Sequence, residues 1–150
     1  MNNLLEIKDL RTSFFTHAGE VRAVDGVSFQ VAAGDVGGIV GESGCGKSVT
    51  ALSVMRLLQP PGRIVSGRIQ WKKRDLVKLP EREMKQIRGN EMGMIFQDPM
   101  TSLNPVLSIK HQMIESLMLH KQLSKQAAVE RGIELMKQVG IPAPEERIEQ

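Results

Sequence analysis

The sequence predicts an α/β fold, and three observations support that prediction. A glycine-rich stretch at residues 41–48 lies between a short apolar run and a segment with helical periodicity. Strand-like runs precede this stretch, and two further helical patterns begin at residue 109. The chain has 150 residues, 41% of them hydrophobic and 25% charged, which is the size and composition of one ordinary globular domain.

The expected strands come from alternating or continuous apolar runs. Residues 4–10 and 21–31 predict two strands joined by a loop, and residues 36–40 predict a short strand that enters the glycine-rich stretch. Two more strands are expected at residues 63–71 and at residues 92–97. Together they would supply the sheet of the α/β fold.

Helical periodicity predicts the other elements. A helix is expected directly after the glycine-rich stretch, with its apolar positions at Ala51, Leu52, Met55 and Leu58. A short helix is expected to open at Leu79-Pro80-Glu81 and to end near Gly89. Two longer helices follow from apolar residues spaced four apart, the first from Ile109 and the second capped by Ser124 and stopped at Gly140.

The glycine-rich stretch matches G-x-x-x-x-G-K-[ST] at every fixed position, and this pattern is the phosphate-binding P-loop. Its glycines let backbone N–H groups approach phosphate oxygens. Lys47 is expected to reach the β- and γ-phosphates, the Ser48 hydroxyl to ligate Mg²⁺, and the helix dipole to favour the anion. The predicted nucleotide-contacting residues of the loop are Gly41, Glu42, Ser43, Gly44, Cys45, Gly46, Lys47, Ser48 and Val49.

Charge and composition exclude other classes of protein. The 20 lysines and arginines are offset by 17 acidic residues, and the net charge of +3 is too small for a nucleic-acid-binding surface. Cys45 is the single cysteine, so no internal disulfide framework exists, and this usage fits a reducing compartment. Because no apolar run approaches the length of a membrane span, we expect no direct membrane insertion.

Three segments resemble the nucleotide-binding subunits of ATP-binding-cassette (ABC) importers for dipeptides and oligopeptides. They are residues 24–29, residues 40–48, and residues 94–105 with the sequence Met-Ile-Phe-Gln-Asp-Pro-Met-Thr-Ser-Leu-Asn-Pro. The similarity covers nearly the whole chain, and the last of these segments favours the peptide-importer branch. The resemblance implies the P-loop NTPase fold of an ABC nucleotide-binding domain. Residues 1–97 would form the N-terminal β region and the P-loop part of the ATP-binding core, and residues 98–150 the start of the helical subdomain.

The resemblance also implies roles for residues outside the P-loop. Gln97 resembles the family's Q-loop glutamine, which places an amide oxygen on Mg²⁺ or the attacking water and transmits the nucleotide state to the membrane subunits. With Lys47, it is the expected catalytic residue. Phe14 or Phe15 lies where the family has an aromatic residue that stacks on adenine. The sequence leaves open which of the two stacks and whether either is instead a core residue of a strand.

Cofactors and partners follow from the same resemblance. It implies ATP and Mg²⁺, transmembrane permease subunits, a second nucleotide-binding subunit, and a peripheral location on the cytoplasmic face of the cell membrane. The chain stops at Gln150, before the positions of the family's signature motif, Walker B carboxylates and switch histidine. We therefore expect the N-terminal part of an ABC ATPase, which binds nucleotide and by itself turns it over poorly.

Three functional hypotheses are compared. The first is the ATPase subunit that powers peptide import, and the second is a hydrolysis-incompetent ATP-binding fragment that only docks on its permease. The third is another NTPase, such as a small-molecule kinase or a DNA-repair cassette. Kinases lack the Phe-Gln-Asp-Pro block, and repair cassettes would show zinc-type cysteine pairs or long heptads. The first hypothesis is preferred for the family.

Three single positions carry further expectations. Gly37 stands where relatives have a large apolar residue, and Lys73 where they often have a turn glycine, so both predict lower stability. Cys45 lies inside the P-loop, and its alkylation is expected to block ATP binding, the alternative being an inert thiol at a variable loop position.

Overall fold

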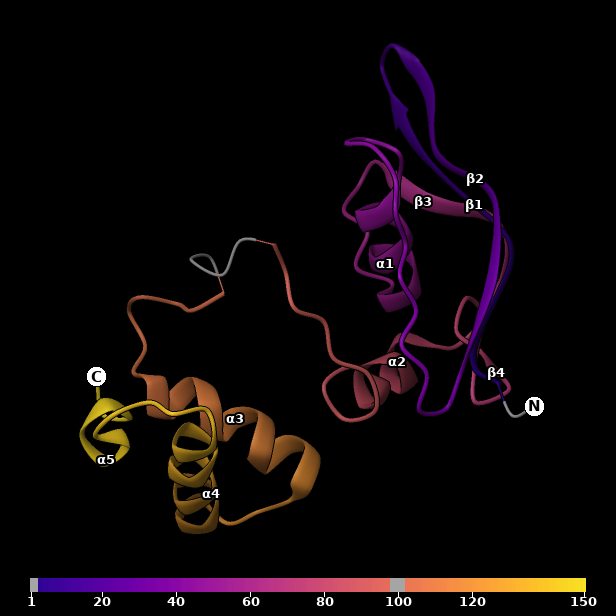
Figure 1. Cartoon of the computed structure of the whole chain (residues 1–150). Helices are drawn as coiled ribbons and strands as arrows, with labels where there is room; N and C mark the ends of the chain where they lie inside the picture. The colour runs from indigo at the N-terminus through magenta and orange to yellow at the C-terminus, as the bar shows by residue number, and fades with distance from the viewer. Residues whose placement is uncertain (1–2, 98–101) are drawn as a thin grey trace. The chain divides into compact units, whose positions relative to one another are not determined.

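The computed structural model describes residues 3–97 and 102–150, which form two compact units, Met1–Lys85 and Gln86–Gln150 (Figure 1). The first unit contains β1 (Asn3–Thr16), β2 (Gly19–Ala32), α1 (Lys47–Met55), β3 (Gly62–Trp71) and β4 (Arg74–Asp75). The short helix α2 (Glu81–Ile87) follows, and the second unit holds α3 (Ile109–Lys121), α4 (Lys125–Gln138) and α5 (Pro144–Arg147).

The first unit is built on an antiparallel sheet of four strands in the order β2-β1-β3-β4. The two expected N-terminal strands form one long hairpin, in which Thr12 pairs with Val24 and Phe14 with Val21. β1 is paired on both sides, by β2 and by β3, whereas β2 forms the edge of the sheet and is paired only with β1. α1 packs against β1, β2 and β3. Most buried side chains of this unit are apolar, among them Ile7, Leu10, Ile69 and Leu76, but the hydroxyl side chains of Thr12 and Ser53 are buried as well.

Two of the expected strands do not form. Residues 36–40 and residues 92–97 have no extended partner among the described residues, apart from one isolated bridge between Arg88 and Met92. Val36 is 99% exposed and Val40 is 93% exposed. The prediction of strands here is wrong for a physical reason, because an apolar run becomes a strand only when a neighbouring strand satisfies its N–H and C=O groups.

The turn between β3 and β4 has two residues, Lys72 and Lys73, and both have positive φ angles, +46° and +68°. Two consecutive left-handed residues are the geometry of a type I′ hairpin turn, which favours Asn-Gly. Lys73 thus occupies the conformation in which a glycine would carry no Cβ penalty.

The second unit is helical, as its sequence periodicity predicts. Ser108 accepts a hydrogen bond from the His111 amide at the start of α3, and Ser124 accepts one from the Ala127 amide at the start of α4. The end of the chain closes on α3, because the Lys110 amide donates to the Ile148 carbonyl at 2.7 Å. The buried side chains of this unit include Ile114, Ala128, Met136 and Ile148.

The Lys137 ammonium and the Glu145 carboxyl form an exposed ion pair in the helical unit. A hydrogen bond from the Lys137 ammonium, together with a backbone hydrogen bond, lowers the pKa of the Glu145 carboxyl below its ordinary value.

No helix within the described ranges combines the length and the apolar character needed to cross a bilayer.

Candidate nucleotide-binding site

The P-loop, residues 41–48, leads directly into α1, and two of its glycines have left-handed backbones. Gly44 has φ +82° and Gly46 has φ +90°. A Cβ on Gly46 would lie 2.3 Å from the Ala23 carbonyl oxygen in β2, whereas a Cβ on Gly44 would meet nothing within 4 Å. Gly46 therefore fixes the end of the loop against the sheet, and Gly44 faces open space.

The first turn of α1 presents unused backbone donors. Gly46 occupies the N-cap position without a side-chain cap, and the first turn holds no acidic residue. Thr50 is the first residue whose amide is hydrogen bonded in the helical manner, to the Gly46 carbonyl at 2.8 Å. Within residues 3–97 and 102–150, the amide N–H groups of Lys47, Ser48 and Val49 have no acceptor. They lie at the positive end of the helix dipole, which favours an anion.

The Lys47 side chain folds over the P-loop. Its ammonium nitrogen donates to the carbonyl oxygens of Gly41 and Glu42, both at 2.7 Å, and lies 3.4 Å from the Cys45 sulfur. These bonds hold a positive charge above the loop and give it a defined position. An incoming phosphate would replace one or more of these carbonyl acceptors with a stronger, charge-assisted one.

The remaining loop residues leave room for a ligand. Glu42, Ser43 and Ser48 are exposed, and Cys45 is an exposed free thiol. A Cβ at Gly41 would meet the Cys45 sulfur at 2.5 Å, so a side chain there would have to displace the Cys45 thiol. These loop residues are therefore accessible to a ligand.

The described residues contain no group of three or more His, Cys, Asp or Glu side chains that could hold a metal ion. Mg²⁺ usually retains water and takes only one or two ligands from the protein, with phosphate oxygens supplying others. The Ser48 hydroxyl beside the free amides suits that mode of binding. The site thus fits Mg²⁺ that arrives with a nucleotide.

Hydroxyl side chains form hydrogen bonds inside α1 and between α1 and β1. The sequence analysis did not single them out. The Thr50 hydroxyl donates to the Gly46 carbonyl at 2.9 Å, and the Ser53 hydroxyl donates to the Val49 carbonyl at 2.7 Å. The Thr12 hydroxyl of β1 lies 2.9 Å from the Ser53 hydroxyl. A sequence signal existed, because Ser and Thr are poor residues for a helix interior and often bond back to the carbonyl four residues earlier.

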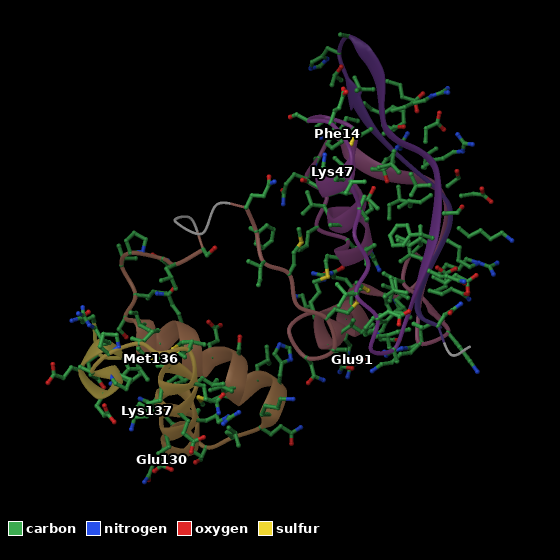
Figure 2. All side chains as sticks on the ribbon, in the orientation of Figure 1. Phe14, Lys47, Glu91, Glu130, Met136 and Lys137 are labelled. Atoms are coloured by element: carbon green, nitrogen blue, oxygen red, sulfur yellow. The ribbon has the colours of Figure 1, made fainter. Side chains whose placement is uncertain are left out.

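The two phenylalanines of β1 lie on opposite faces of the sheet, because successive side chains of a strand alternate. Phe14 shares its face with Thr12, whose hydroxyl meets α1, and the Phe14 ring packs on Gly62. Figure 2 labels Phe14 and Lys47 at the same end of α1. Phe15 is on the other face, 37% exposed, with the Arg63 guanidinium 4.0 Å from its ring centroid. The structure thus brings Phe14, and not Phe15, to the face that carries the P-loop helix.

Gln97 belongs to the second unit, where it is exposed and follows the unpaired apolar segment. The four residues after it in the resemblance, Asp98, Pro99, Met100 and Thr101, lie outside the described residues. The role expected for Gln97 remains a prediction.

These features place the chain in the class of P-loop proteins. They are the G-x-x-x-x-G-K-[ST] sequence, the left-handed Gly46 at the N-cap of α1, and the Lys47 ammonium held over the loop. The family comparison narrows this class. A family model described as ABC transporter matches residues 24–150, so the chain belongs to the ABC transporter family.

Two curated relatives resemble the chain over its whole length. The oligopeptide transport ATP-binding protein OppD of Bacillus subtilis (strain 168) is 51% identical, the match covering 100% of this chain and 42% of the relative. The dipeptide transport ATP-binding protein DppD of the same strain is 48% identical, the match covering 100% of this chain and 45% of the relative. The chain therefore spans less than half the length of these relatives.

Solved structures support the fold. The dimeric bacterial ABC transporter cassette MJ0796 matches with a TM-score of 0.76 at 21% identity, over 89% of this chain and 56% of that one. A post-hydrolysis state of the same cassette, bound to ADP and Pi, matches with a TM-score of 0.72 at 19% identity, over 89% of this chain and 57% of that one. The predicted fold class, the P-loop NTPase fold of an ABC nucleotide-binding domain, is confirmed.

Proposed function

We propose that this chain is the nucleotide-binding part of an ATP-binding subunit of a dipeptide or oligopeptide importer, and that its P-loop holds Mg-ATP. One observation carries the proposal. Among the described residues the amides of Lys47, Ser48 and Val49 at the start of α1 have no acceptor, and the Lys47 ammonium is held over the same loop, so an anion is favoured there. The names of the relatives support peptide transport as the process.

Within this site, each group has a distinct part. The free amides and Lys47 bind phosphate oxygens, and the Ser48 hydroxyl contributes one oxygen to Mg²⁺. The Phe14 ring is the platform for adenine, since it lies on the same sheet face as α1. Gln97 adds its amide oxygen to the metal or to the attacking water.

The partners follow from the class of transporter. We propose permease subunits in the membrane and a second nucleotide-binding subunit, with the chain held peripherally at the cytoplasmic face. Residues 1–97 serve the ATP-binding core, and residues 98–150 begin the helical subdomain. The dimeric cassette among the solved relatives supports the second nucleotide-binding subunit.

A second proposal concerns turnover. The contacts around the P-loop are ground-state phosphate contacts, whereas hydrolysis also needs an oriented water and groups that stabilise the developing charge. We propose that this chain by itself binds ATP without appreciable hydrolysis. Phosphate release should not exceed that of a Lys47→Ala control, and steady release that depends on Lys47 would contradict the proposal.

The test of the binding function is calorimetric titration of Mg-ATP into the wild type and Lys47→Ala. Loss of the charge-assisted contact should weaken binding by about 1.5–3 kcal/mol, roughly tenfold to a hundredfold. Lys78→Ala is the control, because Lys78 is an exposed lysine of the same unit, ion paired with Asp75. Equal affinity of Lys47→Ala and the wild type would overturn the proposed function.

A further inference from the structure

A buried pair of hydroxyl groups joins the sheet to the P-loop helix. Thr12 of β1 and Ser53 of α1 are both fully buried, at 0% exposure. Their hydroxyl oxygens lie 2.9 Å apart, across 41 residues of sequence. Because a buried hydroxyl left without a partner costs free energy, each member of this pair keeps the other in place.

The direction of the hydrogen bonds follows from counting protons. The Ser53 hydroxyl lies 2.7 Å from the Val49 carbonyl oxygen, and a carbonyl oxygen can only accept. The Ser53 hydroxyl therefore donates its single proton to the Val49 carbonyl, and in the second hydrogen bond the Ser53 oxygen accepts from the Thr12 hydroxyl. The result is an ordered relay from the Thr12 hydroxyl through Ser53 to the Val49 carbonyl, which we call the hydroxyl relay.

The two ends of the hydroxyl relay belong to the two parts of the candidate site. Thr12 lies two residues before Phe14 on the same face of β1. Val49 lies in the first turn of α1, where its own amide is one of the free donors. A hydrogen bond constrains both distance and direction, whereas the hydrophobic effect is non-directional.

We propose that the hydroxyl relay is a positioning device that sets Phe14 relative to the P-loop and thereby gives the site its preference for an adenine nucleotide over a bare triphosphate. Thr12 and Ser53 are positioning residues, since neither would touch the nucleotide. The inference rests on the proposed function and deepens it, because it names what aligns the base platform with the phosphate site.

Two variants of Thr12 separate the hydrogen bond from the side-chain volume. Thr12→Val keeps the shape and removes the donor, and Thr12→Ser keeps the donor. Ser13→Ala is the matched control, because Ser13 is the next residue of β1, is also buried, and lines the opposite face of the sheet with Arg11 and Asp25. For each protein, calorimetry gives the affinities for Mg-ATP and Mg-tripolyphosphate, and thermal unfolding gives the melting temperature.

Thr12→Val should lose about threefold to tenfold in ATP affinity, as part of the stacking contribution disappears, while tripolyphosphate affinity stays within about twofold of the wild type. Thr12→Ser should retain the ATP preference. Ser13→Ala should leave the ratio of the two affinities unchanged, whatever its melting temperature. If Thr12→Val does not fold, Ser53→Ala breaks the relay from the other end and should lower the same ratio.

The outcomes separate the inference from the function on which it rests. An unchanged affinity ratio in a folded Thr12→Val or Ser53→Ala variant overturns the relay while leaving the P-loop assignment intact. A wild type that binds tripolyphosphate and ATP equally well overturns both the relay and the Phe14 platform. A wild type that binds neither ligand overturns the proposed function and the relay with it.

Discussion

The two sides of the P-loop are held in very different ways. On the upstream side, residues 36–40 lie unpaired, and Val36 and Val40 are almost completely exposed. On the downstream side, Gly46 packs against β2, while Thr50 and Ser53 are buried and hydrogen bonded. The contrast shows that the backbone donors of the site are organised by the helix and the β1–β2 hairpin. The upstream strand-like segment contributes little to them in this chain.

The strongest test of this contrast is Gly46→Ala. Both loop glycines with left-handed backbones should resist a side chain, at roughly 1–2 kcal/mol each. Only Gly46 also faces the Ala23 carbonyl, so overpacking should add about 1–3 kcal/mol there. We expect Gly46→Ala to lower the free energy of unfolding more than Gly44→Ala, as chemical denaturation would measure. Equal losses would mean that the contact with β2 does not support the loop.

A second comparison concerns the two faces of β1. Phe14→Leu keeps apolar volume and removes the ring on the helix-bearing face, and Phe15→Leu does the same on the other face. We expect Phe14→Leu to weaken ATP binding by up to about 1–3 kcal/mol, the size of a base-stacking contribution. Phe15→Leu, the matched control, should change it little. Titration of both variants with ATP decides the matter, and a larger loss in Phe15→Leu would reverse the assignment.

Lys73→Gly should stabilise the first unit without touching the site. The residue has φ +68° in a two-residue turn, so a glycine removes a left-handed penalty of roughly 1 kcal/mol. The melting temperature is expected to rise, with ATP affinity unchanged. Lys78→Gly, outside the turn, serves as the control, and a lower melting temperature for Lys73→Gly would show that the turn prefers a side chain.

The smallest effect is expected upstream of the loop. Gly37 stands where relatives have a large apolar residue, but residues 36–40 form no strand, and the Cβ of a Gly37→Val variant would meet only the Val31 side chain at 3.7 Å. The free energy of unfolding should change by less than about 0.5 kcal/mol. A clear rise in the melting temperature would indicate that this segment packs more tightly than the structure describes.

Sequence reasoning found the features that local chemistry determines. The P-loop spacing, the Ser124 cap and the helices from Ile109 onward depend on nearby residues, and all three are present. Strands depend on partners far away in the chain, which explains why the 63–71 strand formed and the 36–40 strand did not. The choice between Phe14 and Phe15 was open for the same reason, since only the register of β1 assigns a face to each.

The hydroxyl relay could not be predicted from the sequence either. Its members, Thr12 and Ser53, are 41 residues apart, and nothing in either local pattern pairs them. Ser53 alone could have been noticed as a hydroxyl inside a helix, but its partner required the packing of α1 on β1. Long-range polar contacts of this kind follow from the fold rather than from a motif.

Amide hydrogen exchange of the wild type, with and without saturating Mg-ATP, tests the central claim most directly. The amides of Ser48 and Val49 have no protein acceptor among the described residues, so a bound phosphate chain should slow their exchange by at least about tenfold. Thr50, already bonded to the Gly46 carbonyl, should respond much less. Unchanged exchange at Ser48 and Val49 in the presence of bound ATP would contradict the claim that these amides hold the phosphates.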